Sequence, residues 1–180
     1  MSHPPSVVFS HVGIFVADTV AMENFYTGFL GFVVTDRGNL GAQKLVFLSR
    51  DPREHHQVVL VSGRPADSPF NVINQLSFRV ENLAALREFH RRAQDAKLAE
   101  IAPVTHGNAV SLYFRDPEGN RIELYMDTPW YAQQPQRIPV DLSLDDEALW
   151  KSIEEKTRVL PDFKSQAAWQ AEIRRRMETA

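Results

Sequence analysis

The stretch that decides the fold is residues 113–125, YFRDPEGNRIELY, which predicts a strand, a tight turn and a second strand. Pro117 fixes φ and Gly119 tolerates a positive φ, so the centre of the stretch favours a turn. The second strand carries a carboxylate, Glu123, between apolar neighbours. On the solvent face Glu123 would cost nothing, whereas on the inner face it must be paired or bind a metal. Taken alone the stretch favours the solvent face, and the rest of the chain shifts that balance.

Composition sets the class of protein. A chain of 180 residues is one domain, or one compact domain with an appendage, and 43% apolar and 24% charged residues are ordinary for a globular protein. A net charge of −3 argues against nucleic-acid binding. The absence of cysteine excludes disulfides and thiolate chemistry, which leaves six histidines as ligands or acid–base groups. With no membrane-length apolar run and no signal-like start, we expect a cytoplasmic protein without a membrane partner.

The same order of elements occurs twice along the chain. The first half predicts strands over 7–16, 32–35, 44–48 and 56–61, with a helix from Asp18 or Thr19 to about Phe29. After a linker at 62–71, the second half predicts strands over 75–80, 98–104, 109–114 and 121–126, with a helix capped by Asn82. A shift of 64 positions places His11 on Gln75 and Val59 on Glu123. Two βαβββ units of this size cannot each bury a sheet face alone, so we expect them to pack side by side around a shared cleft.

The predicted fold class is therefore α+β, with paired βαβββ modules and a C-terminal helical extension. We expect one domain over residues 7–127, with modules at about 7–62 and 72–127, followed by an extended segment and two helices over 128–180. These helices start near Ser143 and Ser165 and carry Trp150 and Trp169. Because large aromatic side chains are costly to expose, the helices should cover apolar surface of this chain or of a second subunit, as in a homodimer.

Three positions related by the repeat could bind a metal. His11, Gln75 and Glu123 supply an imidazole, an amide oxygen and a carboxylate, all competent ligands for Fe²⁺, Mn²⁺, Ni²⁺ or Zn²⁺. The fourth related position holds Val59, which cannot coordinate, so coordination positions would stay open as in catalytic sites. The structural alternatives are a hydrogen-bonded histidine at a strand end and an ordinary polar residue at a strand start.

At this point the chain resembles the vicinal oxygen chelate superfamily. The resemblance is carried by His11-Val-Gly-Ile-Phe-Val-Ala-Asp, by Phe25-Tyr26 with Leu30-Gly31-Phe32, and by Asp116-Pro-Glu-Gly-Asn-Arg-Ile-Glu123. That superfamily includes glyoxalase I, bleomycin and fosfomycin resistance proteins, and the type I extradiol ring-cleaving dioxygenases. The resemblance covers about residues 7–127, and residues 128–180 lie outside it.

Within the superfamily the chain is most similar to the extradiol dioxygenases, which hold Fe²⁺ with two histidines and a glutamate. His11 and Glu123 fall on the first and third of these ligands. The second is a histidine in an Asn-His pair, where this chain has Asn74-Gln75. Glutamine is a ligand in some glyoxalase I enzymes, so metal binding survives this change more easily than iron oxygen chemistry does.

The resemblance also implies three catalytic residues. His55-His56 matches a histidine pair whose second member is an acid–base group, Tyr113 lies ten residues before the ligand glutamate, and His106 matches a further histidine if its loop is two residues shorter. Simpler interpretations are a solvated turn for His55-His56, a loop residue for His106 and an inner-face aromatic for Tyr113.

The implied function is ring cleavage of a catechol-like aromatic diol by a metal-dependent extradiol-type dioxygenase, within aromatic compound catabolism. The implied cofactor is a divalent metal, Fe(II) first, with Mn(II), Ni(II) and Zn(II) as alternatives. Two other functions stay open. One is a glyoxalase-like metal-dependent isomerase or lyase that uses no O₂, and the other is a non-catalytic protein that binds a small aromatic ligand.

Overall fold

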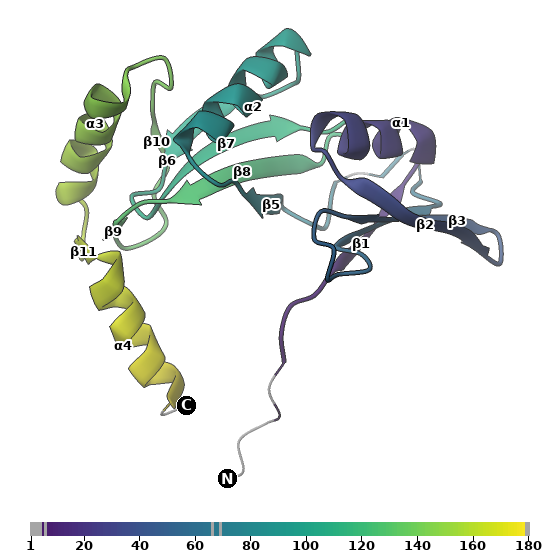
Figure 1. Ribbon diagram of the computed structural model, residues 1–180, viewed down its shortest axis with the longest axis horizontal. Helices are drawn as coiled ribbons and strands as arrows, with labels where there is room; N and C mark the ends of the chain where they lie inside the picture. The colour runs from purple at the N-terminus through teal and green to yellow at the C-terminus, as the bar shows by residue number, and fades with distance from the viewer. Residues whose placement is uncertain (1–4, 6, 66, 69, 179–180) are drawn as a thin grey trace. The chain divides into compact units, whose positions relative to one another are not determined.

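The computed structural model describes residues 5, 7–65, 67–68 and 70–178 (Figure 1). It confirms the α+β class, with sheets and helices arranged as two compact units. The first unit comprises Met1–Val72 with Asp116–Gly119, and the second comprises Ile73–Arg115 with Asn120–Ala180. No helix in the described residues is both long and apolar enough to cross a membrane.

The first unit has the predicted β-α-β-β-β order. Its elements are β1 (Val12–Val16), α1 (Thr19–Asn24), a π-helical turn η1 (Phe25–Phe29), β2 (Val33–Leu40), β3 (Gln43–Ser49) and β4 (Val58–Ser62). The strand order is β1-β4-β3-β2, with β1 parallel to β4. Asp18 caps α1 as predicted, because its carboxylate accepts hydrogen bonds from two backbone N–H groups of the first turn at 3.0 Å.

The second unit repeats this topology. Its module consists of β5 (Leu76–Arg79), α2 (Leu83–Asp95), β6 (Ala102–Thr105), β7 (Ala109–Arg115) and β8 (Arg121–Asp127). The sheet order is β10-β6-β7-β8-β5, with β5 parallel to β8, and β10 (Ile138–Pro139) adds an edge strand from the C-terminal segment. Asn82 caps α2, which packs on β7 and β8.

The 64-residue repeat is confirmed by the strand register. In the first unit Gly13 lies opposite Val59, and in the second Ser77 lies opposite Glu123. His11 and Gln75 each directly precede the strand that pairs in parallel with the last strand of its unit. The two residues therefore occupy equivalent positions, as the sequence predicts.

The pleat of the second sheet separates an apolar face from a polar one. Side chains alternate along a strand, so the apolar residues of β7 and β8 share one face; these are Leu112, Phe114, Ile122 and Leu124, all at most 2% exposed. This face can pack against the buried leucines of α2. The opposite face carries Ser111, Tyr113 and Glu123, and the candidate site is built on it.

The C-terminal segment belongs to the second unit. It contains β9 (Trp130–Tyr131), α3 (Asp146–Arg158), β11 (Lys164–Ser165) and α4 (Gln166–Glu178). Helix α3 buries Leu149 and Ile153 completely, as expected for a helix that covers apolar surface. Helix α4 buries no residue. Its Trp169 stacks on Tyr131 with ring centroids 5.2 Å apart, and its Glu172 pairs with Lys164. The predicted covering role is thus confirmed for α3 and limited to one aromatic contact for α4.

Several boundaries differ from the sequence prediction. Strand β2 extends to Leu40 rather than to residue 35, and β6 starts at Ala102 rather than at residue 98. Residues 7–10 are not part of the first strand, and Val7 is 91% exposed, because no described strand lies beside them to accept their hydrogen bonds. The first helix ends in a π-helical turn rather than continuing as an α-helix to Phe29. Helix α3 is capped by Asp145, because the Ser143 hydroxyl bonds to Asp141 instead. Linker positions 66 and 69, and most of residues 1–6, lie outside the described residues.

Candidate functional site

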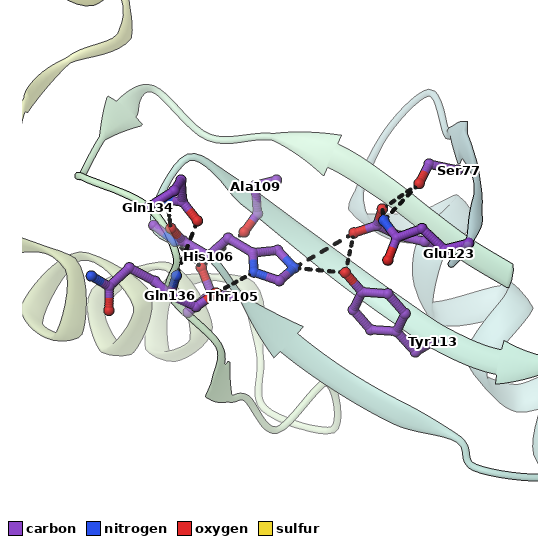
Figure 2. A network of polar contacts seen from close by, with 10 residues as sticks. Ser77, Thr105, His106, Ala109, Tyr113, Glu123, Gln134 and Gln136 are labelled. Carbon is purple, nitrogen blue, oxygen red and sulfur yellow. Dashed lines mark hydrogen bonds and ion pairs between the residues drawn. The ribbon is translucent and has the colours of Figure 1, made fainter. Parts of the chain in front are cut away.

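Glu123 is buried in the second unit and accepts hydrogen bonds at both carboxylate oxygens (Figure 2). The Tyr113 hydroxyl donates to Oε1 at 2.6 Å, across the β7–β8 register. Ser77 Oγ donates to Oε2 at 2.5 Å from the neighbouring strand β5, and Gln75 Nε2 donates to the same oxygen at 2.7 Å. The solvent-facing position that the stretch alone favoured is therefore wrong, and the inner-face position is correct.

The donors around Glu123 keep it ionised. Burial raises the pKa of this carboxyl group, but hydrogen bonds from His106, Ser77 and Tyr113 outweigh burial and lower the pKa to about 2. Burial and the adjacent anion raise the pKa of Tyr113 instead, so its hydroxyl keeps its proton at neutral pH. The site thus pairs the negatively charged Glu123 with the neutral Tyr113 hydroxyl.

His106 lies in the turn between β6 and β7, and both of its ring nitrogens have polar partners. Its Nδ1 lies 2.5 Å from the Gln136 carbonyl oxygen, which can only accept, so Nδ1 carries a proton. Its Nε2 lies 3.0 Å from the Tyr113 oxygen and 3.5 Å from Glu123 Oε1. The same carboxylate raises the pKa of His106. His106 is a loop residue, as the simpler interpretation has it, but it has specific polar partners.

The remaining two candidates lie together in the first unit. The His11 and His56 rings have centroids 4.2 Å apart, and His55 Nδ1 lies 2.9 Å from His56 Nδ1. Burial, followed by the neighbouring histidines, lowers the pKa of His56, which favours a neutral imidazole at pH 7. His55 also reaches Asp36, at 3.4 Å. The turn before β4 is thus a cluster of imidazoles rather than an isolated solvated pair.

The structure therefore brings the six candidates together as two groups. Gln75, His106, Tyr113 and Glu123 form one group in the second unit, and His11 and His56 form the other in the first unit. The sequence analysis missed Ser77. Its position opposite Glu123 follows from the repeat, since Ser77 is the counterpart of Gly13.

Ser111 is a second residue that the sequence analysis missed. Its hydroxyl is fully buried on the same face as Tyr113 and is close enough to favour the Glu123 anion. It nevertheless makes no hydrogen bond of normal geometry with any described residue. A buried polar group without a partner is expected to meet water or a ligand.

The described residues contain no cluster of three histidine, aspartate or glutamate side chains that could hold a metal by themselves. Glu123 and Gln75 could nevertheless supply two of the ligands of a divalent metal. The hydrogen bonds to Glu123 are compatible with this role, because carboxylates that bind metals are themselves hydrogen-bonded. Rotation of the Gln75 amide about its last torsion would exchange its N–H for its carbonyl oxygen. That rotation would also release one donor from Glu123 Oε2, so both residues would present an oxygen.

A pocket of about 400 Å³ lies beside this group, within the second unit. It is lined by Gln75, His106 and Tyr113, together with residues from β8 and the C-terminal segment that include Arg121, Gln134 and Arg137. The pocket is large enough for a single substituted ring.

Comparison with known proteins agrees with this topology. The family model described as the Glyoxalase/Bleomycin resistance protein/Dioxygenase superfamily matches residues 8–124. Biphenyl-2,3-diol 1,2-dioxygenase 2 from Rhodococcus globerulus is 27% identical over 158 residues, which cover 78% of this chain and 80% of that protein. Biphenyl-2,3-diol 1,2-dioxygenase 3 from the same organism is 33% identical over 112 residues, which cover 59% and 56%. The chain thus spans about half the length of the second relative.

Solved structures show the same fold. A glyoxylase/bleomycin resistance protein/dioxygenase domain from Frankia sp. EAN1pec is 24% identical, covers 69% of this chain and 100% of its own, and has a TM-score of 0.59. A fosfomycin resistance protein, FosX, from Listeria monocytogenes, complexed with Mn(II) and 1S,2S-dihydroxypropylphosphonic acid, is 18% identical. It covers 69% of this chain and 93% of its own, with a TM-score of 0.55. At these identities the likeness concerns the fold alone.

Proposed function

Because the chain belongs to the glyoxalase/bleomycin resistance protein/dioxygenase superfamily, we propose that it opens the ring of a catechol-like aromatic diol in a metal-dependent, extradiol-type reaction. The observation that carries this proposal is the buried, ionised Glu123 under Tyr113 and His106, next to a pocket of ring size. The two relatives named as biphenyl-2,3-diol 1,2-dioxygenases support the same substrate class.

We assign His11, Gln75 and Glu123 as the metal ligands, following the resemblance. Glu123 is the only anion of the three, so it should contribute most to binding a dication. Fe(II) is the metal proposed first, with Mn(II), Ni(II) and Zn(II) as alternatives. A bound metal would supply Lewis acidity toward the two diol oxygens and, as Fe(II), redox chemistry toward O₂.

The acid and base roles follow from opposite pKa shifts. The raised pKa of His106 makes it a proton donor near neutral pH, and it faces the pocket beside the Tyr113 hydroxyl. The lowered pKa of His56 makes it a proton acceptor. We propose that His56 accepts a proton from the diol, and that His106 and Tyr113 orient and protonate the substrate oxygen.

Replacement of Gln75 by histidine tests the proposal. An imidazole binds Fe²⁺ better than an amide oxygen, so Gln75→His should bind Fe²⁺ more tightly and raise catechol-dependent O₂ consumption. The assays are anaerobic Fe²⁺ titration and oxygen-electrode measurements with several catechols. Asn74→His is the matched control, because it adds an imidazole at the adjacent exposed position.

The outcomes separate the candidate functions. Tighter iron binding without O₂ uptake in either protein would count against ring cleavage, and metal-dependent turnover of another substrate without O₂ would favour a glyoxalase-like isomerase or lyase. Weaker iron binding in Gln75→His than in the wild type would mean that residue 75 is not a ligand.

A non-catalytic aromatic-binding protein is the second candidate. It is favoured by one observation: the Gln75 amide donates to Glu123, so both Glu123 oxygens are hydrogen-bonded without a metal. Metal analysis of protein purified anaerobically, with aromatic binding measured before and after EDTA treatment, distinguishes the two. Metal-free protein that binds aromatics unchanged would support this second candidate.

A further inference from the structure

The pocket beside Glu123 is positively charged in a protein that is negative overall. The chain has 23 acidic and 20 basic residues, excluding histidine. Among the described residues that line the pocket there is no carboxylate, but there are two arginines, Arg121 and Arg137. The Glu123 carboxylate, which lies next to the pocket, already accepts hydrogen bonds from Tyr113, Ser77 and Gln75. The arginine charges are therefore not balanced within the pocket.

Arg137 is held in place without an ionic partner. Its guanidinium carbon lies 5.4 Å from the centroid of the Tyr113 ring, a cation–π distance. In the part of the chain that the structure describes, no carboxylate forms an ion pair with Arg137. A guanidinium in a cation–π contact can still donate from its N–H edge, which is the edge that binds carboxylates in a bidentate manner.

Arg121 lies directly opposite another arginine. It precedes Glu123 by two residues on β8 and therefore lies on the same face of the sheet. Its cross-strand neighbour is Arg115, which takes the Glu100 carboxylate at 2.7 Å. Like charges directly opposite on adjacent strands are destabilising, and Glu100, which also interacts electrostatically with Arg121, forms its ion pair with Arg115. A bound anion would offset this repulsion.

We propose that the pocket binds a carboxylate substituent on the aromatic ring of the substrate, with Arg137 and Arg121 as the binding residues. The inference deepens the proposed function, on which its diol component rests, and names the substrate class as a carboxylated aromatic diol. A carboxylate matches the planar guanidinium edge in geometry and charge, and a ring with one such group matches a pocket of about 400 Å³. Neutral diols lack this contact and bind less tightly.

The test is anaerobic calorimetry of the full-length, Fe(II)-loaded protein with 2,3-dihydroxybenzoate, 3,4-dihydroxybenzoate, catechol and benzoate. We expect at least one dihydroxybenzoate to bind about tenfold or more tightly than catechol. Arg137→Gln and Arg121→Gln should each weaken that binding by about tenfold to hundredfold, the range for hydrogen bonds to a charged group, and change catechol binding little. Arg137→Lys keeps the charge but loses the bidentate edge, so it should fall between.

Arg91→Gln is the matched control, because this exposed arginine of α2 lies outside the pocket and its loss changes the net charge equally. Thermal melts of each variant show whether it is folded. Equal loss in Arg91→Gln, or no preference for either dihydroxybenzoate, would overturn the proposal. Displacement of the dihydroxybenzoate by equimolar inorganic phosphate would overturn the carboxylate class.

The two levels of inference fail separately. Arginine-dependent binding of benzoate and a dihydroxybenzoate without O₂ uptake would uphold the carboxylate site and reject ring cleavage. O₂ uptake with catechol, together with dihydroxybenzoate binding that is no tighter than catechol binding and is unchanged in both arginine variants, would uphold ring cleavage and reject the carboxylate site.

Discussion

Ionised Glu123 should contribute about 3 kcal/mol to the folding free energy of the metal-free protein at neutral pH. Its pKa falls from an ordinary 4.5 to about 2 in the folded protein, and each pKa unit corresponds to about 1.4 kcal/mol. Its side chain is only 9% exposed, so solvent screening reduces this figure little. Because the folded pKa is depressed, the contribution is complete above the unfolded pKa near 4.5 and is lost as pH falls toward 2. About 2 kcal/mol of it should disappear between pH 6 and pH 3.

Urea unfolding followed by circular dichroism, in EDTA at several pH values from 3 to 6, measures this loss. Glu123→Gln keeps the shape of the side chain but does not titrate, so its unfolding free energy should fall by about 2 kcal/mol less than that of the wild type over this range. Glu155→Gln removes an exposed carboxylate on α3 and should follow the wild type. His106 does not interfere with this measurement at pH 3 to 6. Because its pKa is raised in the folded protein, its contribution to stability is lost only at higher pH, as pH rises through the folded pKa. Identical pH slopes for wild type and Glu123→Gln would refute the reasoning.

Three further predictions concern the core and the metal ligands. Gly107→Ala should lower the unfolding free energy by about 1 kcal/mol or more beyond Gly119→Ala in urea denaturation. Both glycines have positive φ, but only at 107 would a Cβ meet side-chain carbons at 3.0 and 3.1 Å, so equal costs would contradict the packing. Ile153→Ala should cost about 2–5 kcal/mol, because this side chain is fully buried on α3, and an unchanged melting temperature would count against the helix as core. Glu123→Gln should lower metal occupancy, measured by mass spectrometry after dialysis, more than Gln75→Glu does; equal, full occupancy would place the metal elsewhere.

Local sequence signals account for most of the fold. Asp18 and Asn82 are found as helix caps, because a short side-chain acceptor satisfies the N–H groups of the first turn wherever the helix lies. The 64-residue repeat also predicted the register that places Val59 and Glu123 at equivalent positions. Such features depend on residues close in sequence or on a pattern that occurs twice.

Boundaries were less predictable where several local signals compete. Ser143 and Asp145 are both good capping residues, and the choice between them depends on Asp141, which takes the Ser143 hydroxyl. The apolar run at 7–10 has strand-like composition, yet a strand forms only where a neighbour supplies hydrogen bonds, and β4 starts opposite Val12.

The sequence by itself determined the α+β class, the two βαβββ modules and, through a family resemblance, the residue types of the candidate site. Only the tertiary structure decided their chemical states. The pKa of Glu123 is lowered by donors that include Ser77 and Tyr113, and the pKa of His106 is raised by Glu123 and the Gln136 carbonyl. Proton affinity depends on burial and on the donors and charges within a few ångströms, and packing alone sets these. Arg137 lies outside the repeat, so only the tertiary structure, which brings it to Tyr113, assigns it to the pocket.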